Sequence, residues 1–141
     1  MAQMRRRKTR EVALQFLYQL DLHGERRSRS ARGGVLVAPP GRRGDPRVRA
    51  TRLVRGTKAN QGKIDQIISQ FAEHWDLERM AVVDRNILRL AVYELLWTED
   101  VPPKVAINEA IEIAKKFGTK ESSRFINGLL DRIHKELRPA S

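Results

Sequence analysis

The chain of 141 residues contains no cysteine. This absence excludes disulfide bonds, thiolate zinc sites and thiol nucleophiles, and it agrees with a reducing compartment. No apolar run reaches the ~18 residues that a membrane-spanning helix needs. The basic N-terminus is followed by an apolar segment that polar residues interrupt, unlike the core of a secretory signal peptide. We therefore expect a cytoplasmic protein with no membrane association.

Sequence patterns for catalysis and nucleotide binding are also missing. The chain has no G-x-x-x-x-G-K-[ST] or G-x-G-x-x-G loop, so nothing predicts a bound nucleotide. Its histidines, His23, His74 and His134, lie on separate segments and lack convincing metal-ligand spacing. Ser122 and Ser123 have no base nearby in the sequence, and helix capping is the favoured role for them. We expect no enzymatic activity, no metal site and no cofactor.

Positive charge is abundant and unevenly distributed. The chain has 28 Lys and Arg against 17 Asp and Glu, a net charge of +11. Residues 1–60 hold 16 of the cations and 4 of the anions, whereas residues 61–141 are nearly neutral. A basic segment joined to a neutral body is typical of proteins that bind nucleic acid or another anionic surface. Charge alone leaves RNA, DNA and membranes open.

The strongest basic cluster comes at the N-terminus, just before an apolar-patterned helix. Its members are Arg5, Arg6, Arg7, Lys8 and Arg10. Each cation that neutralises a phosphate releases a counterion, so a basic arm coupled to a helix suits phosphate binding. A solvated terminus is the alternative. Gln15 and Tyr18 follow on the helix, where Gln can read a base edge and Tyr can stack on an unpaired base. A lone aromatic residue on an amphipathic helix is more often part of the core.

Apolar periodicity predicts an all-α protein with a single domain of about six helices. The first helix is expected over Thr9–Leu22 and is ended by Gly24. Residues 25–47 are rich in Arg, Gly and Pro without helical periodicity, which predicts an irregular loop. Further apolar residues at helical spacing occur in residues 48–54, 64–75, 83–95, 105–117 and 125–137.

Asn127 and Gly128 are unusual because both are poor helix formers inside an apolar-patterned helix. Glycine there costs about 1 kcal/mol relative to alanine. We expect Gly128 to allow a neighbouring helix to approach closely and Asn127 to satisfy a buried backbone group.

Four segments of the chain resemble the NusB transcription antitermination family. They are Arg5–Tyr18 (RRRKTREVALQFLY), Val83–Leu95 (VDRNILRLAVYEL), Val101–Gly118 (VPPKVAINEAIEIAKKFG) and Ser123–Asp131 (SRFINGLLD). The resemblance covers residues 5–23 and about 52–137, and strings of this length in this order are highly specific.

The resemblance implies two packed helical subbundles and no catalysis. It also implies two binding partners: the ribosomal protein NusE and boxA, a short single-stranded RNA element of ribosomal RNA leader transcripts. The complex helps RNA polymerase resist termination. Family members can self-associate, so the sequence leaves both a monomer and a homodimer open. By position, the implied RNA contacts are Arg5, Arg6, Arg7, Lys8, Arg10, Gln15, Tyr18 and, as a stacking candidate, Phe125. The implied partner contacts are Asp84, Phe117 and Glu121, whose acidic members suit a basic ribosomal protein.

Residues 25–50 depart from the family, which usually has a helix there. The stretch is either a basic loop that adds RNA affinity or a local irregularity that replaced the helix. Two other functions compete with antitermination. The first is the NusB-like RNA-binding domain of an RNA methyltransferase. That function requires an appended cofactor-binding domain with a glycine-rich loop, and the sequence to Ser141 contains no such loop. A helical DNA-binding module requires a groove-reading helix with clustered polar base-readers, and no helix shows one.

Overall fold

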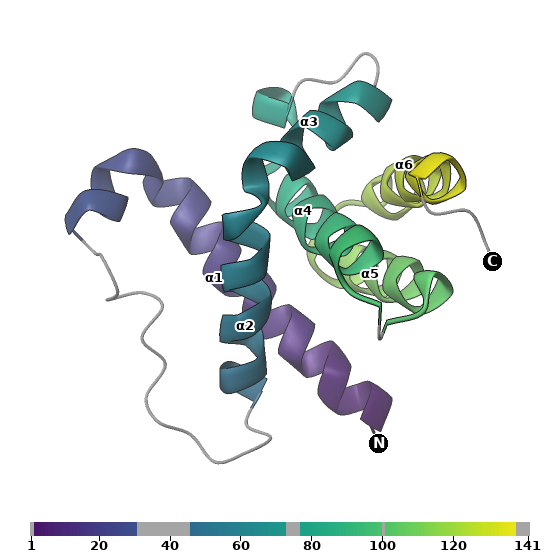
Figure 1. Ribbon diagram of the computed structural model, residues 1–141, viewed down its shortest axis with the longest axis horizontal. Coiled ribbons are helices and arrows are strands. Elements are labelled where there is room, and N and C mark those ends of the chain that lie inside the picture. The colour runs from purple at the N-terminus through teal and green to yellow at the C-terminus, as the bar shows by residue number, and fades with distance from the viewer. Residues whose placement is uncertain (1, 31–45, 73–76, 100, 138–141) are drawn as a thin grey trace. The chain divides into compact units, whose positions relative to one another are not determined.

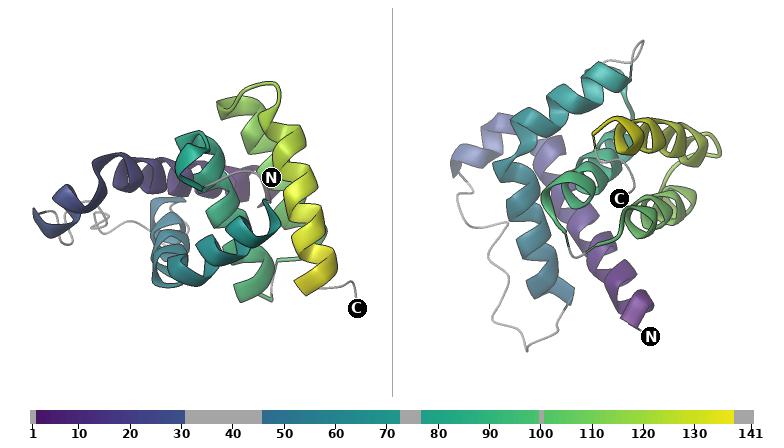
Figure 2. Two further views of the ribbon diagram at one scale, coloured as in Figure 1. Left: turned by 90° about the horizontal axis from the view of Figure 1, so that it is seen from above. Right: turned by 45° about the vertical axis from the view of Figure 1, so that its right-hand side comes forward.

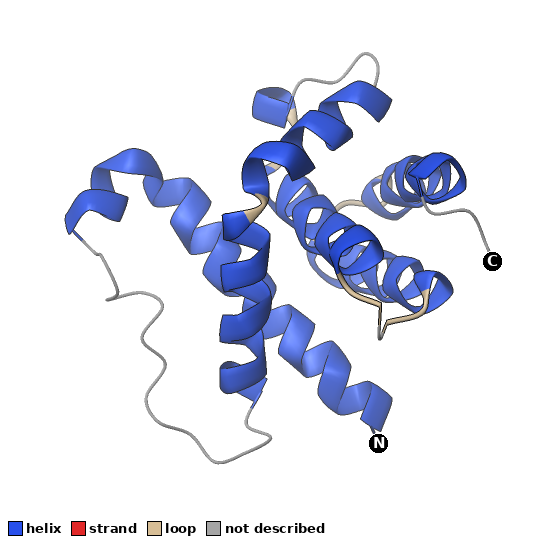
Figure 3. Cartoon of the chain, in the orientation of Figure 1, coloured by secondary structure: helices blue, strands red, loops and turns tan. Residues whose placement is uncertain are grey.

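The computed structural model of the chain describes residues 2–30, 46–72, 77–99 and 101–137. Over these ranges the structure contains helices and no strand, which confirms the all-α prediction (Figures 1 and 3). The elements are α1 (Ala2–Ser30), α2 (Pro46–Ala59), α3 (Gln61–Phe71), the 3-10 helix η1 (Leu77–Arg79), α4 (Val82–Trp97), α5 (Pro103–Phe117) and α6 (Ser122–Leu137). None of these described helices is both long enough and apolar enough to span a bilayer.

The chain divides into two compact units, Met1–Gly56 and Thr57–Ser141. The first contains α1 and most of α2, and the second contains the end of α2 and all later helices. Two units agree with the two helical subbundles that the resemblance implies. Each unit carries its own set of candidate functional residues.

The second unit is built around α4. This helix contacts α3, α5 and α6, and α5 also contacts α6, which Figure 2 shows in yellow beside it. An unbroken run from Asn86 to Val92 is buried, as expected for a helix with neighbours on several sides. The fully buried side chains of the unit come from α3, α4 and α6 and include Ile64, Ile68, Leu88, Leu95, Ile126, Leu129, Leu130 and Ile133. Apolar burial of this kind is the main stabilising contribution in the unit.

A polar cluster joins α3 to the first half of α4. Arg89 donates from Nε to Asp65 Oδ1 at 2.9 Å and from Nη2 to Asp65 Oδ2 at 3.1 Å. Its Nη1 also donates to Asn86 Oδ1 at 3.2 Å, and Asn86 Nδ2 donates to the Val82 carbonyl at 2.8 Å. A bidentate arginine–carboxylate pair is directional as well as strong. The cluster therefore holds the start of α4, which carries Asp84, in a defined place against α3.

The first helix is much longer than its sequence pattern predicts. We expected Thr9–Leu22 with an end at Gly24, and α1 instead runs from Ala2 to Ser30. Its basic N-terminal residues are therefore helical, and the prediction of an irregular loop is wrong for residues 25–30. Glycine lowers helix stability by only about 1 kcal/mol, and the Glu and Arg residues that follow favour helix. The loop prediction is also wrong for residues 46–47, which begin α2. Residues 31–45 of the expected loop lie outside the described residues.

Asn127 and Gly128 do not have the packing roles that we expected. Both are exposed, and a Cβ built on Gly128 meets no described atom within 4 Å. The expectation failed because both residues lie on the solvent side of α6, opposite the buried Ile126, Leu129 and Leu130. Their helix-forming cost is therefore not offset by a contact that the structure describes.

We expect Gly128→Ala to raise the free energy of unfolding by about 1 kcal/mol, because alanine fits the space and favours helix. Urea denaturation measures the change. Gly118→Ala is the matched control, since its Cβ would lie 2.5 Å from Ser122 Oγ and 2.9 Å from the Ala114 carbonyl oxygen. It should lower stability, and a loss at Gly128 as well would contradict the open position of that residue.

Candidate nucleic-acid interface and acidic pocket

The basic cluster of α1 separates into surface and buried members. Arg6 and Lys8 are exposed, and Arg7 is half-buried. Arg10, in contrast, is only 5% exposed. The side chain of Arg5 lies outside the described residues. The surface members form a cationic site at the start of the helix.

Helical spacing explains why Arg10 differs from its neighbours. Arg10 precedes Ala13, Leu14 and Leu17 by three, four and seven residues, so it shares their face of α1. These three side chains are buried core residues. The same spacing is readable in the sequence, but the contiguous run of cations concealed it. The geometry favours a structural role for Arg10 over a contact with a soluble ligand.

One face of α1 continues the cationic site along the helix. Lys8 and Gln15 are exposed and lie seven residues apart, which places them two turns apart on one face. Gln19 and Leu22 extend this exposed face, and Leu22 is 54% exposed. We did not predict these two residues from the sequence, although they follow Gln15 by four and seven residues and therefore share its face. Tyr18 is half-buried at the edge of the face, so part of its side chain remains accessible.

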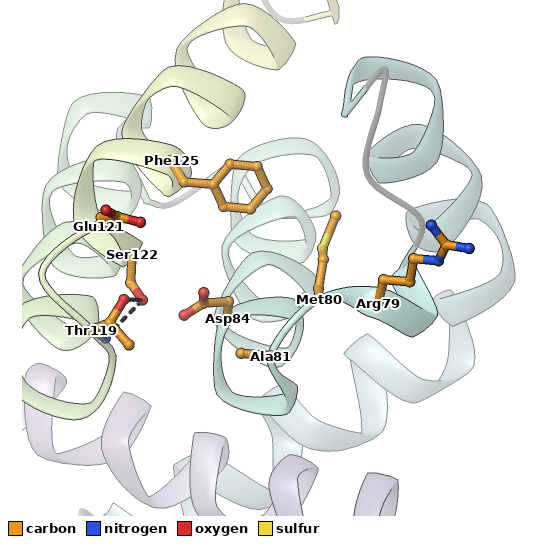
Figure 4. A pocket seen from close by; sticks show the side chains of 8 residues that line it. All are labelled: Arg79, Met80, Ala81, Asp84, Thr119, Glu121, Ser122 and Phe125. Atoms are coloured by element: carbon orange, nitrogen blue, oxygen red, sulfur yellow. Dashed lines mark hydrogen bonds between the residues drawn. The ribbon is translucent and has the colours of Figure 1, made fainter.

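The second unit contains a pocket of about 260 Å³ between the start of α4 and the start of α6 (Figure 4). Its lining residues are Arg79, Met80, Ala81, Asp84, Thr119, Glu121, Ser122 and Phe125. In Figure 4 the Phe125 ring and the Met80 side chain project into the pocket, whereas Arg79 points away from it. Apolar walls with two carboxylates suit a ligand group that is both apolar and positively charged.

Asp84 supplies the pocket with a carboxylate acceptor. It lies in the first turn of α4, where the helix dipole favours a carboxylate. Its Oδ1 atom is buried and has no hydrogen-bond partner within the described part of the chain. Figure 4 shows the carboxylate pointing towards the turn that contains Thr119 and Ser122. A donor from a bound partner would satisfy this oxygen.

The turn between α5 and α6 is held tightly. Gly118 ends α5 as predicted, and its N–H donates to the Ala114 carbonyl at 2.8 Å. The Thr119 N–H donates to Ser122 Oγ at 2.9 Å, so this hydroxyl serves the turn before α6. A side chain at position 118 would collide with Ser122. The tight turn places Glu121 and Phe125 at the pocket.

The structure brings together three of the binding residues that the resemblance implies. Asp84, Glu121 and Phe125 line one pocket, although Phe125 was expected to contact RNA. Phe117 lies at the end of α5 and is 38% exposed, and it is not among the lining residues. Lys116 Nζ lies 5.3 Å from the Phe117 ring centroid, a cation–π distance. Met80 and Arg79 were missed, because no pattern on their own segment indicates which helix lies opposite.

The NusB family model matches residues 7–135, which is most of the chain. The chain belongs to the NusB family. Among NusB relatives, the transcription antitermination protein NusB of Desulfosudis oleivorans is 45% identical, covering 94% of this chain and 86% of its own length.

Two solved NusB structures have the same fold. T. maritima NusB superimposes with a TM-score of 0.76 at 44% identity, covering 93% of this chain and 91% of that one. A complex of the antitermination factors NusB and NusE with double-stranded RNA matches with a TM-score of 0.75 at 29% identity. That match covers 94% of this chain and 97% of the other.

Proposed function

We propose that this NusB-family protein is a transcription antitermination factor. In this role it binds boxA-type single-stranded RNA of ribosomal RNA leader transcripts together with NusE, and the assembly helps RNA polymerase resist termination. It acts in the cytoplasm by binding, with no residue in a catalytic role. The observation that carries the proposal is the exposed cationic start of α1 in a chain whose relatives are NusB antitermination proteins.

The RNA surface is proposed on α1. Arg6, Arg7 and Lys8, with Arg5, hold backbone phosphates, because cations on a regular helix neutralise phosphates at defined positions. Gln15 and Tyr18 contact bases further along the helix. Single-stranded RNA exposes base edges and faces that a duplex conceals, which suits one polar and one aromatic contact. Arg10 supports this surface from within the fold.

The partner surface is proposed at the acidic pocket and the adjacent end of α5. Asp84 and Glu121 offer negative charge to a basic ribosomal protein, and complementary charge favours fast and selective association. Phe125 and Met80 supply apolar walls, and Phe117 adds an exposed aromatic side chain. Phe125 also stacks on RNA that lies near the partner.

A reconstituted transcription assay tests this function. The template carries a boxA-like element upstream of a terminator, and a matched template carries a scrambled element. The protein and NusE together should increase read-through only on the first template. Equal read-through on both templates would contradict the proposal, as would an effect that does not require NusE.

A further inference from the structure

The second helix carries a row of cations that the proposed function does not use. The sequence of α2, PRVRATRLVRGTKA, contains five cations and no acidic residue. Arg47, Arg49, Arg52, Arg55 and Lys58 are all exposed. Three of them, Arg49, Arg52 and Arg55, follow one another at three-residue intervals within the first unit. We call these three residues the α2 ridge.

The geometry of the α2 ridge is set by the helix. Residues three apart are surface neighbours, so the ridge winds across the exposed side of α2. Ala50 and Val54 lie on the opposite side of α2 and are fully buried. Their burial keeps the side that carries the ridge exposed. With a rise of about 1.5 Å per residue, the ridge is about 9 Å long. A single stacked nucleic-acid strand places about three nucleotides along that length.

Helix stability does not account for this arrangement. The first turn of α2 has no acidic residue and contains Arg47 and Arg49, although the helix dipole disfavours cations there. Neighbouring like charges on a helix surface also repel each other. A bound polyanion would remove both penalties.

The chemistry of the ridge selects among polyanions. All three cations of the ridge are arginines, whose planar guanidinium groups bind phosphate in a bidentate manner. A membrane-surface helix would need an apolar face to insert into lipid. The apolar residues Ala50 and Val54 are buried within the protein and are not available for insertion.

We propose that the α2 ridge is a second RNA contact, which binds backbone phosphates and reads no bases. The inference deepens the proposed function by adding a sequence-independent surface to the base-contacting surface of α1. Contacts to phosphates position RNA without specifying its sequence. The ridge therefore raises affinity equally for all single-stranded RNAs.

The test measures binding of two labelled single-stranded RNAs by fluorescence anisotropy over a range of salt concentrations. One RNA is boxA-like and the other is oligouridine of the same length. The ridge variant combines Arg49→Gln, Arg52→Gln and Arg55→Gln. A matched control combines Lys63→Gln, Lys104→Gln and Lys135→Gln, which removes three exposed cations from other helices. Circular dichroism verifies that both variants keep the helix content of the original protein.

We expect the ridge variant to bind both RNAs at least about tenfold more weakly at low salt, with a salt slope shallower by about 2. The control variant should keep the original slope. Replacing the same three arginines with lysine retains the charge and should restore most of the slope. A ridge variant that behaves like the control would overturn the proposal. The proposal would also be overturned if the ridge variant lost binding to phosphatidylserine vesicles but kept its binding to RNA.

The two RNAs separate failure of this inference from failure of the proposed function. Equal affinity of the unsubstituted protein for the boxA-like RNA and oligouridine would contradict the proposed function. Binding of oligouridine by the ridge variant would still measure the contribution of the ridge. Preserved preference with a ridge variant equal to the control would contradict the ridge alone.

Discussion

Replacing Arg6, Arg7 and Lys8 together with alanine should weaken binding of boxA-like single-stranded RNA by roughly a hundredfold at low salt. The same change should make the salt dependence shallower by about 2, because three phosphate contacts no longer release counterions. Arg6 and Lys8 are exposed and Arg7 is half-buried on α1, so the helix should still form. Binding isotherms at several salt concentrations measure both quantities.

Arg10→Gln is the control for this experiment. Arg10 is buried on the face of α1 that carries Ala13, Leu14 and Leu17. Its replacement should lower the melting temperature while the salt slope of RNA binding stays unchanged. An unaltered slope in the triple variant would refute the role of the α1 cations. A shallower slope in Arg10→Gln would mean that the arginine reaches RNA despite its burial.

Asp84→Lys should weaken binding of NusE by roughly a hundredfold, while RNA binding by the protein alone stays within about twofold. The substitution replaces a pocket carboxylate by a cation that repels a basic partner. One oxygen of that carboxylate is buried with no donor in the described part of the chain. Asp84→Asn removes the charge at nearly constant shape and should have a smaller effect. Isothermal titration calorimetry with purified NusE measures the affinities.

Glu99→Lys supplies the matched charge reversal for Asp84→Lys. Glu99 is exposed and follows the opposite end of α4, so it is far along the helix from the pocket. Its reversal should leave NusE binding unchanged. If Asp84→Lys impaired RNA and partner binding equally, the variant would be misfolded and the assignment of the pocket would lose its support. Equal effects of the two reversals would indicate only a general charge effect.

Local periodicity predicts the helices of the second unit well, because each buries a regular apolar face. Gly118 was correctly expected to end α5, since the chain turns sharply there. Gly24 was wrongly expected to end α1, because glycine weakens a helix without terminating it when good helix formers follow. The difference lies in the surroundings, as Gly118 has Ser122 and Ala114 against it.

The candidate site could be predicted only in part. The acidic pocket joins Asp84 to Glu121 and Phe125, and the packing of α4 beside α6 brings these distant segments together. Periodicity assigns each residue to a face of its own helix but does not indicate which helices adjoin. The resemblance to the family grouped Asp84 with Glu121, and the structure added Met80. The spacing of Arg10 to Leu14 and Leu17 indicates its burial, and the position of Gly128 opposite Ile126 and Leu130 indicates its exposure. Both could therefore have been predicted from the sequence.

The most direct measurement is binding of a boxA-like single-stranded RNA compared with a scrambled RNA and a DNA duplex. It is made with and without purified NusE at two salt concentrations. We predict selective binding of the boxA-like RNA, strengthened by NusE and retained in part at the higher salt. Equal binding to all three nucleic acids, lost at the higher salt and unaffected by NusE, would contradict the account and leave only a general polycation.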